Sequence, residues 1–207
     1  MHNCLVGSEM CIRDRPRRFG SRSHPRSEQQ RSVVKPSKGI RPVFLPTNMV
    51  KYWLMKSELD VYPYAQLVAD GKTHWDGVRN YQARNMMRDE MKVGDLILYY
   101  HSNCKPPHVA GIAKVCNEGY GDFTSWDSSS KYFDEKSTPE NPRWFMVDIE
   151  PVCELENIVS LDAVRQEEAL ADMLLIRRGQ RLSIQPVKEN EFRHICSMGG
   201  VDPSKIE

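Results

Sequence analysis

The stretch Trp75–Asn85, WDGVRNYQARN, is the part of the sequence around which we expect the rest to be organised. It combines two aromatic residues with a glycine, an acid, two arginines and several side-chain amides, which are expensive to bury without partners. Gly77 permits a turn that other residues resist, and Asn80 is a good N-cap for a helix that begins at Tyr81. The stretch therefore predicts a loop that leads into a helix N-terminus, where free N–H groups favour anions and polar ligands.

Apolar spacing supports a helix after this loop. The apolar residues that fall on one arc of it are Ala83, Met86, Met87 and Met91. Arg84 and Arg88 lie one turn apart on another face. A purely structural interpretation stays open for single residues, with Trp75 in the core and Asp76 paired with Arg79. For the loop as a whole we favour a binding site.

The formal net charge of the 207 residues is +1, but the charges are unevenly distributed. Residues 1–49 contain ten Lys/Arg against three Asp/Glu, whereas residues 50–207 contain nineteen against twenty-five. Tight non-specific binding of nucleic acid depends on neutralising phosphates, so a mildly acidic folded part argues against it. Recognition of a ligand by a small pocket stays open.

We expect three segments: a disordered basic leader over residues 1–49, a folded domain over residues 50–198, and a tail over residues 199–207. The leader is rich in Arg, Ser and Pro, a composition typical of disorder. Its run Arg13–Arg18 is typical of a nuclear-import signal, a phosphate-binding tail or a solvated segment without a role, and we predict a nuclear protein. Its opening, Cys4–Arg15, resembles translated adapter sequence.

The six cysteines show no CxxC spacing and no zinc-finger arrangement with histidine. We therefore expect reduced thiols of an intracellular protein, with no metal and no cofactor. No stretch is long and apolar enough to span a membrane. The short chain without heptads favours a monomer.

Short apolar runs predict strands at residues 52–55, 96–100, 109–115, 143–152 and 182–184. Short helices are predicted at residues 61–69, 161–165, 169–175 and 188–196. This mixture has no βαβ rhythm and favours an α+β fold built around a small barrel.

Two strands end in polar clusters, Lys56–Glu58 and His101–Asn103, and strand ends are good positions for a site. The basic turn Arg177–Arg181 suits a phosphate or a solvated surface equally well.

Several sequence blocks occur in one order that resembles a known family. They are YWLMKSELD from Tyr52, THWDGVRNYQARN from Thr73, VGDLILYYHSNCKPP from Val93, AGIA from Ala110, PENPRWFMV from Pro139 and ADMLLIRRGQRLSIQPV from Ala171. On these blocks, residues 51–197 resemble the EVE domain of the PUA-like superfamily, in its thymocyte nuclear protein type. The resemblance implies a small, mostly antiparallel β-barrel flanked by short helices. It also implies a cleft that recognises modified nucleobases, particularly modified cytosine, in DNA or RNA.

The resemblance also implies which residues form the site. The pocket for the modified base would use Lys56, Ser57, Glu58, Trp75, Asp76, Gly77, Val78, Arg79, Asn80, His101, Ser102 and Asn103. Contacts to phosphate or nucleic acid would come from Arg84, Arg178, Gly179 and Arg181. The chain departs from the family pattern at Leu59, where a proline usually follows Ser-Glu, so the exit of the strand is less constrained.

Two other function classes stay open beside this binding module. An enzyme acting on a modified nucleotide or another small ligand would use Glu58, Asp76 and His101 as acid and base. No activated-nucleophile motif or metal set supports it, so we do not expect an enzyme. A protein-interaction adapter would use the aromatic loop 118–141 as its contact surface.

Overall fold

A computed structural model describes residues 49–206, and residues 1–48 and 207 lie outside the described part. The predicted leader, with its Arg13–Arg18 run, therefore falls almost entirely outside it. The strands are β1 Tyr52–Glu58, β2 Thr73–His74, β3 Leu96–Ser102, β4 His108–Gly121, β5 Phe145–Ser160 and β6 Ile184–Val187. The helices are α1 Tyr64–Asp70, α2 Tyr81–Asn85 with a π-helical continuation Met86–Glu90, α3 Leu161–Gln166 and α4 Glu189–Met198. Short 3₁₀ turns cover Phe123–Ser125, Glu168–Leu170, Leu174–Ile176 and Pro203–Lys205.

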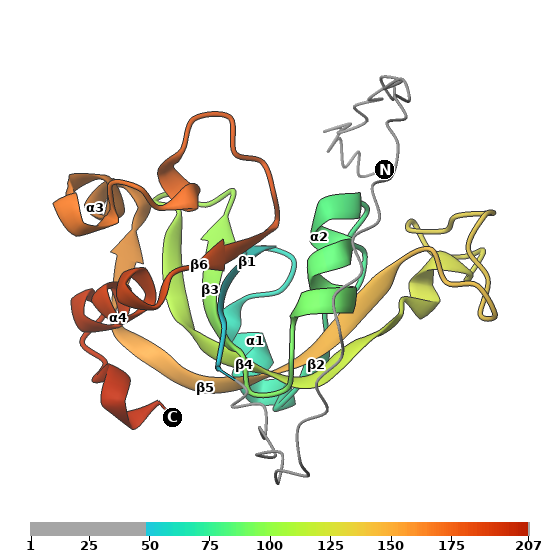
Figure 1. Cartoon of the computed structure of the whole chain (residues 1–207), viewed down its shortest axis with the longest axis horizontal. Helices are drawn as coiled ribbons and strands as arrows, with labels where there is room; N and C mark the ends of the chain where they lie inside the picture. Colours follow the sequence, from blue (N-terminus) through green and yellow to red (C-terminus); the bar gives the residue numbers. More distant parts are fainter. Residues whose placement is uncertain (1–48, 207) are drawn as a thin grey trace, which may run out of the picture. The chain divides into compact units, whose positions relative to one another are not determined.

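The strands form one strongly curved sheet in the order β2-β5-β4-β3-β1-β6 (Figure 1). Within the described part of the chain, only β1 and β3 run parallel, and the other neighbouring strands are antiparallel. Tyr52 pairs with Leu96 and Glu58 pairs with Ser102, so these two strands end side by side. The two polar clusters predicted at strand ends therefore meet at one end of the sheet.

The α+β class is confirmed, but the predicted closure into a small barrel is wrong. The outer strands β2 and β6 have two and four residues, and in the described part of the chain they do not pair with each other. The sheet instead has helices on both sides, with α2 on one side and α3 and α4 on the other (Figure 1). A barrel buries one interior, whereas this sheet buries two apolar faces. Trp53 and Met55 belong to the core shared with α1 and α2, and Leu54 belongs to the core shared with α4.

Local patterns predicted most elements, with differences at their ends. The helix after the central loop begins at Tyr81 as predicted, and its methionine arc is buried. The strand expected to end at residue 152 continues to Ser160, and the helix expected at residues 169–175 is a pair of 3₁₀ turns. In α1, Leu67 is buried, whereas Val68 is half exposed.

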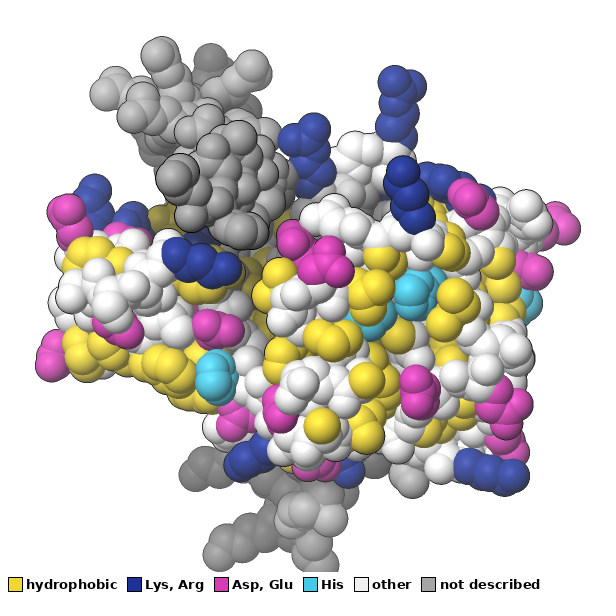
Figure 2. Space-filling view, turned by 180° about the vertical axis from the view of Figure 1, so that it is seen from behind, with side chains coloured by type: hydrophobic (Ala, Val, Ile, Leu, Met, Phe, Trp, Pro, Cys, Tyr) yellow, Lys and Arg dark blue, Asp and Glu magenta, His cyan; other side chains and the backbone are white. Residues whose placement is uncertain are grey.

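The surface carries no broad basic patch on the face seen in Figure 2. Hydrophobic and histidine side chains occupy its centre, mixed with acidic residues, and Lys and Arg lie mainly near its margins (Figure 2).

Among residues 49–206, no helix combines the length and apolar character that crossing a membrane requires.

Candidate nucleic-acid interface

The parallel pairing of β1 and β3 sorts the two polar strand ends onto opposite faces of the sheet. Successive side chains of a strand point to opposite faces, and Lys56 pairs with Tyr100 while Ser57 pairs with His101. Tyr100 belongs to the α4-side core, so Lys56 shares that face. Ser57 and His101 point toward the other face, where α1 lies. The predicted clusters are therefore not single groups of neighbouring side chains.

His101 lies in the interior of the protein, with only 2% of its surface exposed. Its Nε2 accepts the backbone N–H of Tyr64 at 3.3 Å, so in the neutral ring the proton resides on Nδ1. Among the described residues, Nδ1 has no hydrogen-bond partner. Burial, and secondarily the nearby His108, lowers the pKa of His101 to about 4. The ring is therefore neutral at physiological pH and anchors the start of α1.

The α4-side face of this sheet end opens into a cavity of about 550 Å³, within the roughly 300–1,000 Å³ typical of ligand sites. Lys56 contributes from β1, Ser102 and Asn103 from the end of β3, and the turn Arg177–Arg181 closes the other side. The remaining lining residues are Tyr100, Pro107, Leu161, Arg165, Leu175 and Ile176. We call this space the cationic cavity.

The charged side chains that line the cationic cavity are all positive. Its lining contains Lys56, Arg165, Arg177, Arg178 and Arg181, and no carboxylate from the described residues. Among these, only Arg165 forms an ion pair within the described residues, with Asp162 at 3.0 Å. Lys56 is partly buried, and this burial lowers the pKa of its ammonium group, because the charged form is less well hydrated there. An anion in the cavity would offset both the repulsion and the lost hydration.

Polar atoms at the mouth of the cavity are held by the strand ends. Ser102 Oγ donates to the carbonyl of Ser57 at 3.1 Å, and Asn103 Nδ2 donates to Glu58 Oε1 at 2.9 Å. Asn103 has a φ of +55°, a left-handed conformation that asparagine tolerates better than most residues. Glu58 therefore orients Asn103 but does not itself line the cavity.

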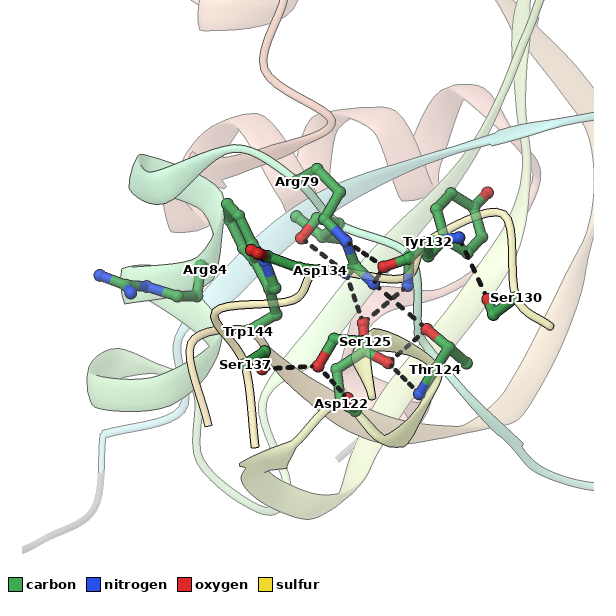
Figure 3. Close-up of polar contacts among 12 residues, drawn as sticks. Arg79, Arg84, Asp122, Thr124, Ser125, Ser130, Tyr132, Asp134, Ser137 and Trp144 are labelled. Carbon is green, nitrogen blue, oxygen red and sulfur yellow. Dashed lines mark hydrogen bonds and ion pairs between the residues drawn. The ribbon is translucent and has the colours of Figure 1, made fainter. Parts of the chain in front are cut away.

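The loop Trp75–Asn80 is fastened to the segment that follows β4 (Figure 3). Arg79 Nη1 and Asp122 Oδ2 lie 2.6 Å apart, and the same oxygen accepts the N–H of Gly77 at 3.1 Å. Arg79 also donates to the carbonyl of Tyr132 and to Thr124 Oγ1. Burial raises the pKa of Asp122, but its bonds with Arg79, Thr124 and Gly77 outweigh this and hold the pKa below the usual range. The carboxylate thus stays charged and organises both segments.

Trp75 and its neighbours face the α1-side core. The half-buried Trp75 packs on that core and meets Tyr99 edge to face, with ring centroids 5.6 Å apart. Val78 is buried. Gly77 has a φ of +73°, and a Cβ there would lie 2.5 Å from the Tyr132 ring, so glycine is required twice over. A cavity of about 380 Å³ lies between Arg79 and Lys131–Lys136.

Asn80 caps α2 as predicted, with Oδ1 accepting the N–H groups of Gln82 and Ala83 at 2.9 and 3.1 Å. Replacing Asn80 with alanine should lower the free energy of unfolding by about 1 kcal/mol, because two helix N–H groups lose their acceptor. Urea unfolding checks this value. Asn80→Asp should retain most of the stability, and a loss as large as that of alanine would contradict the cap.

The geometry brings together some of the predicted residues and separates others. Around the cationic cavity lie Lys56, Ser102, Asn103, Arg178, Gly179 and Arg181. On the α1 side or in the loop fastened to Asp122 lie Ser57, Trp75, Asp76, Gly77, Val78, Arg79, Asn80 and His101. Sequence reasoning missed Arg165 and Asp122. No local signal marks Arg165, whereas an acidic N-cap position before Phe123 could have drawn attention to Asp122.

A family model described as the EVE domain matches residues 51–198. The chain belongs to the EVE domain family. An uncharacterized protein of Schizosaccharomyces pombe is 40% identical over 160 residues, which cover 70% of this chain and 66% of that protein. Thymocyte nuclear protein 1 of Homo sapiens is 39% identical over 176 residues, which cover 76% of this chain and 77% of that protein.

A solved structure of an EVE relative is informative about ligands. The human THYN1 protein in complex with 5-methylcytosine-containing DNA has 37% sequence identity and a TM-score of 0.68. The match covers 74% of this chain and 99% of that one.

In the described part of the present EVE chain, no group of three or more His, Cys, Asp or Glu is placed to hold a metal ion. Cys104, Cys116, Cys153 and Cys196 are free thiols.

Proposed function

We propose that this protein is a nucleic-acid-binding module that recognises a modified nucleobase, with 5-methylcytosine or 5-hydroxymethylcytosine as the expected base. The observation that carries the proposal is the cationic cavity, to whose lining residues 49–206 contribute five Lys/Arg side chains and no carboxylate. Such a site favours phosphate groups. The human relative crystallised with 5-methylcytosine-containing DNA supports the same ligand class.

Phosphate and base would occupy the two faces of one sheet end. Lys56, Arg178 and Arg181, with the Gly179 turn, would hold phosphate in the cationic cavity, and Trp75 would stack on the base on the α1 side. Arg181 lines the cavity, whereas the next residue, Leu182, packs on the core that Trp75 contacts. The backbone N–H of Lys56 donates to the backbone carbonyl of Ser183 at 2.8 Å, and this bond holds the segment that crosses between the two faces against β1. A nucleotide bound at the sheet end would thus reach both groups.

Base-edge groups on each face would supply selectivity. Ser57 on the Trp75 side and Ser102 and Asn103 at the cavity mouth carry hydroxyl and amide groups suited to a base edge. A polar site rejects a ligand that lacks its partner group more strongly than an apolar site does.

The enzyme hypothesis gains no support, because its expected base His101 is buried and accepts a hydrogen bond from the backbone N–H of Tyr64. We also infer that the protein is nuclear and monomeric and that the modified base is carried by DNA or RNA.

The proposal is tested by fluorescence titration of the full chain with short oligonucleotides that carry cytosine, 5-methylcytosine or 5-hydroxymethylcytosine, as DNA and as RNA. Lys56→Gln should weaken binding of every oligonucleotide about fivefold and reduce the salt slope by about one. Trp75→Ala should reduce the preference for the modified base about tenfold or more, because base stacking is lost. Trp126→Ala, another half-buried tryptophan, serves as the matched control.

Three results would count against this function. Equal affinity for modified and unmodified cytosine in the wild-type protein would reduce the module to a charge sensor. A preference unchanged by Trp75→Ala would remove Trp75 from the base site. A pull-down partner that depends on Trp126 and Tyr132 but not on Trp75 would favour the protein-interaction adapter.

A further inference from the structure

A second cluster of aromatic and cationic side chains lies where α2 meets the start of β5, and none of its members lines the cationic cavity. Tyr81 stacks on Trp144 with ring centroids 4.9 Å apart and 26° between the rings. Arg84 Cζ lies 4.9 Å from the centroid of the Tyr81 ring, and Arg143 Cζ lies 5.7 Å from it. We call these four residues the Tyr81 platform.

The Tyr81 ring is exposed although it is held in place. Tyr81 is 49% exposed, whereas Trp144 beneath it is 6% exposed. Trp144 is fixed in turn, because its Nε1 donates to Asp134 Oδ2 at 2.7 Å. An aromatic surface that is already ordered loses little conformational freedom when a ligand stacks on it. The exposed part of the ordered Tyr81 side chain is therefore accessible to a flat partner, which would share the ring with the guanidinium groups of Arg84 and Arg143.

Arg84 supplies a positive charge that has no acidic partner among the described residues. Its Nη1 donates to the carbonyl of Arg143 at 2.9 Å, and its Nε and Nη2 both donate to Asn85 Oδ1. Within residues 49–206 it forms no ion pair, unlike Arg88, which pairs with Asp89. Arg84 extends away from the network around Arg79 and Asp122 (Figure 3). Its neutral acceptors orient the guanidinium group and leave one N–H of each terminal nitrogen unbonded by the described residues.

The charge balance around Arg84 favours an added anion. Burial lowers the pKa of the Arg84 guanidinium, and the charges of Arg88 and Arg143 lower it further, against opposing effects of Tyr81 and Asp89. Arg143 has an acidic partner of its own, Asp134 at 3.4 Å. A purely structural role, in which the four residues attach the segment between β4 and β5 to α2, explains why Trp144 is buried. It does not require the exposed Tyr81 ring or an arginine without an ion pair among the described residues.

We propose that the Tyr81 platform is a second nucleic-acid contact, at which Tyr81 stacks on an unpaired nucleobase while Arg84 and Arg143 bind the adjacent phosphodiester. The proposal rests on the proposed function as a nucleic-acid binder but concerns a surface separate from the cationic cavity. Stacking on aromatic rings is sequence-tolerant, because every base has a π-face. The platform should therefore add affinity for single strands without reading the modification.

The test uses the full chain and fluorescein-labelled single-stranded DNA of about 12 nucleotides, with or without one 5-methylcytosine, over a range of salt concentrations. Tyr81→Ala should weaken binding about tenfold with the salt slope unchanged, and Tyr81→Phe should restore affinity to within about twofold. Arg84→Gln should weaken binding about fivefold and lower the salt slope by about one. Lys205→Gln removes a cation that is 80% exposed and should change nothing.

Thermal unfolding of each variant identifies any loss of fold, and Tyr81→Phe with Arg84→Gln keeps the test valid if Tyr81→Ala unfolds. Wild-type affinity and salt slope in both Tyr81→Ala and Arg84→Gln would overturn the platform. If a glutamate-rich peptide displaces the labelled DNA as strongly as an unlabelled oligonucleotide does, the platform proposal is overturned in favour of an acidic protein partner. Absence of wild-type binding to any oligonucleotide would overturn both proposals.

The two proposals fail in different ways. If the wild-type protein shows no preference for 5-methylcytosine, but Tyr81→Ala and Arg84→Gln lose affinity, base recognition fails and the platform stands. If the preference is present and neither variant loses affinity, the platform fails and base recognition stands. Both are supported when the variants lose affinity and keep the wild-type preference.

Discussion

Replacing Asp122 with alanine is expected to lower the free energy of unfolding by about 3 kcal/mol, because it leaves a partly buried guanidinium without its counter-charge. Asp122 is fully buried and holds Arg79 at 2.6 Å. It also accepts the N–H groups of Gly77 and Thr124 at 3.1 and 2.9 Å. One substitution therefore removes the ion pair and the Gly77 backbone bond that join the Trp75 loop to the segment after β4, together with the Thr124 backbone bond within that segment.

Urea unfolding of the wild-type protein and two aspartate variants measures this effect. Asp127→Ala is the matched control, because Asp127 accepts the N–H of Ser129 at 2.9 Å in the same loop but is exposed. We expect a loss of about 1 kcal/mol or less for the control. Equal losses in the two variants would mean that Asp122 is only a local turn residue. Modified-base preference should fall in Asp122→Ala as well, because the Trp75 loop loses its support.

Acidification is expected to remove about 3 kcal/mol of stability through His101 alone, from a pKa difference of about 2.5 units. The unfolded imidazole titrates near the model value of 6.5, whereas the buried ring titrates at about 4. Because the folded pKa is the lower one, the unfolded state takes up the proton first. The contribution is fully present above about pH 6.5 and is lost progressively as the pH falls toward 4. Among the described groups, His108 and Tyr99 face the ring, with centroids at 5.3 and 5.5 Å.

The measurement compares unfolding free energies at about pH 7 and about pH 4.5 in wild type and His101→Gln. Glutamine does not titrate in this range, and its carbonyl can accept the N–H of Tyr64, so the variant should show a shallower loss. His74→Gln, at an exposed position, should keep the wild-type pH dependence. The same steep loss in His101→Gln would assign the acid sensitivity to carboxylates instead.

Helices and strands were predictable where the cause is local. The dense run Leu96–Tyr100 forms a strand, and Asn80 caps the helix that begins at Tyr81. Caps and apolar periodicity act over a few residues, so they are visible in the chain itself. The second half of β5 lacked such a signal, since half of its residues after Val152 are exposed. Its strand conformation comes from pairing with β4, where Val109 opposes Val159.

Closure of the sheet was not predictable from the strands. A run of apolar residues is equally compatible with a barrel wall and with a sheet covered on both faces. The helices decide between them, because α1 with α2 and α4 supply two separate cores. Two apolar faces must both be covered, so the sheet stays open.

By itself, the sequence determined the family, most elements and the polar groups at the strand ends and in the Trp75 loop. Only the tertiary structure decided which of those groups lie on each face of the sheet and which of them contact one another. The parallel register of β1 and β3 places Lys56 on one face and Ser57 on the other, and Arg79 meets Asp122 across 43 residues of chain. The reason is physical: residue type and spacing act over a turn or a strand, whereas register and long-range ion pairs exist only once distant segments are packed together.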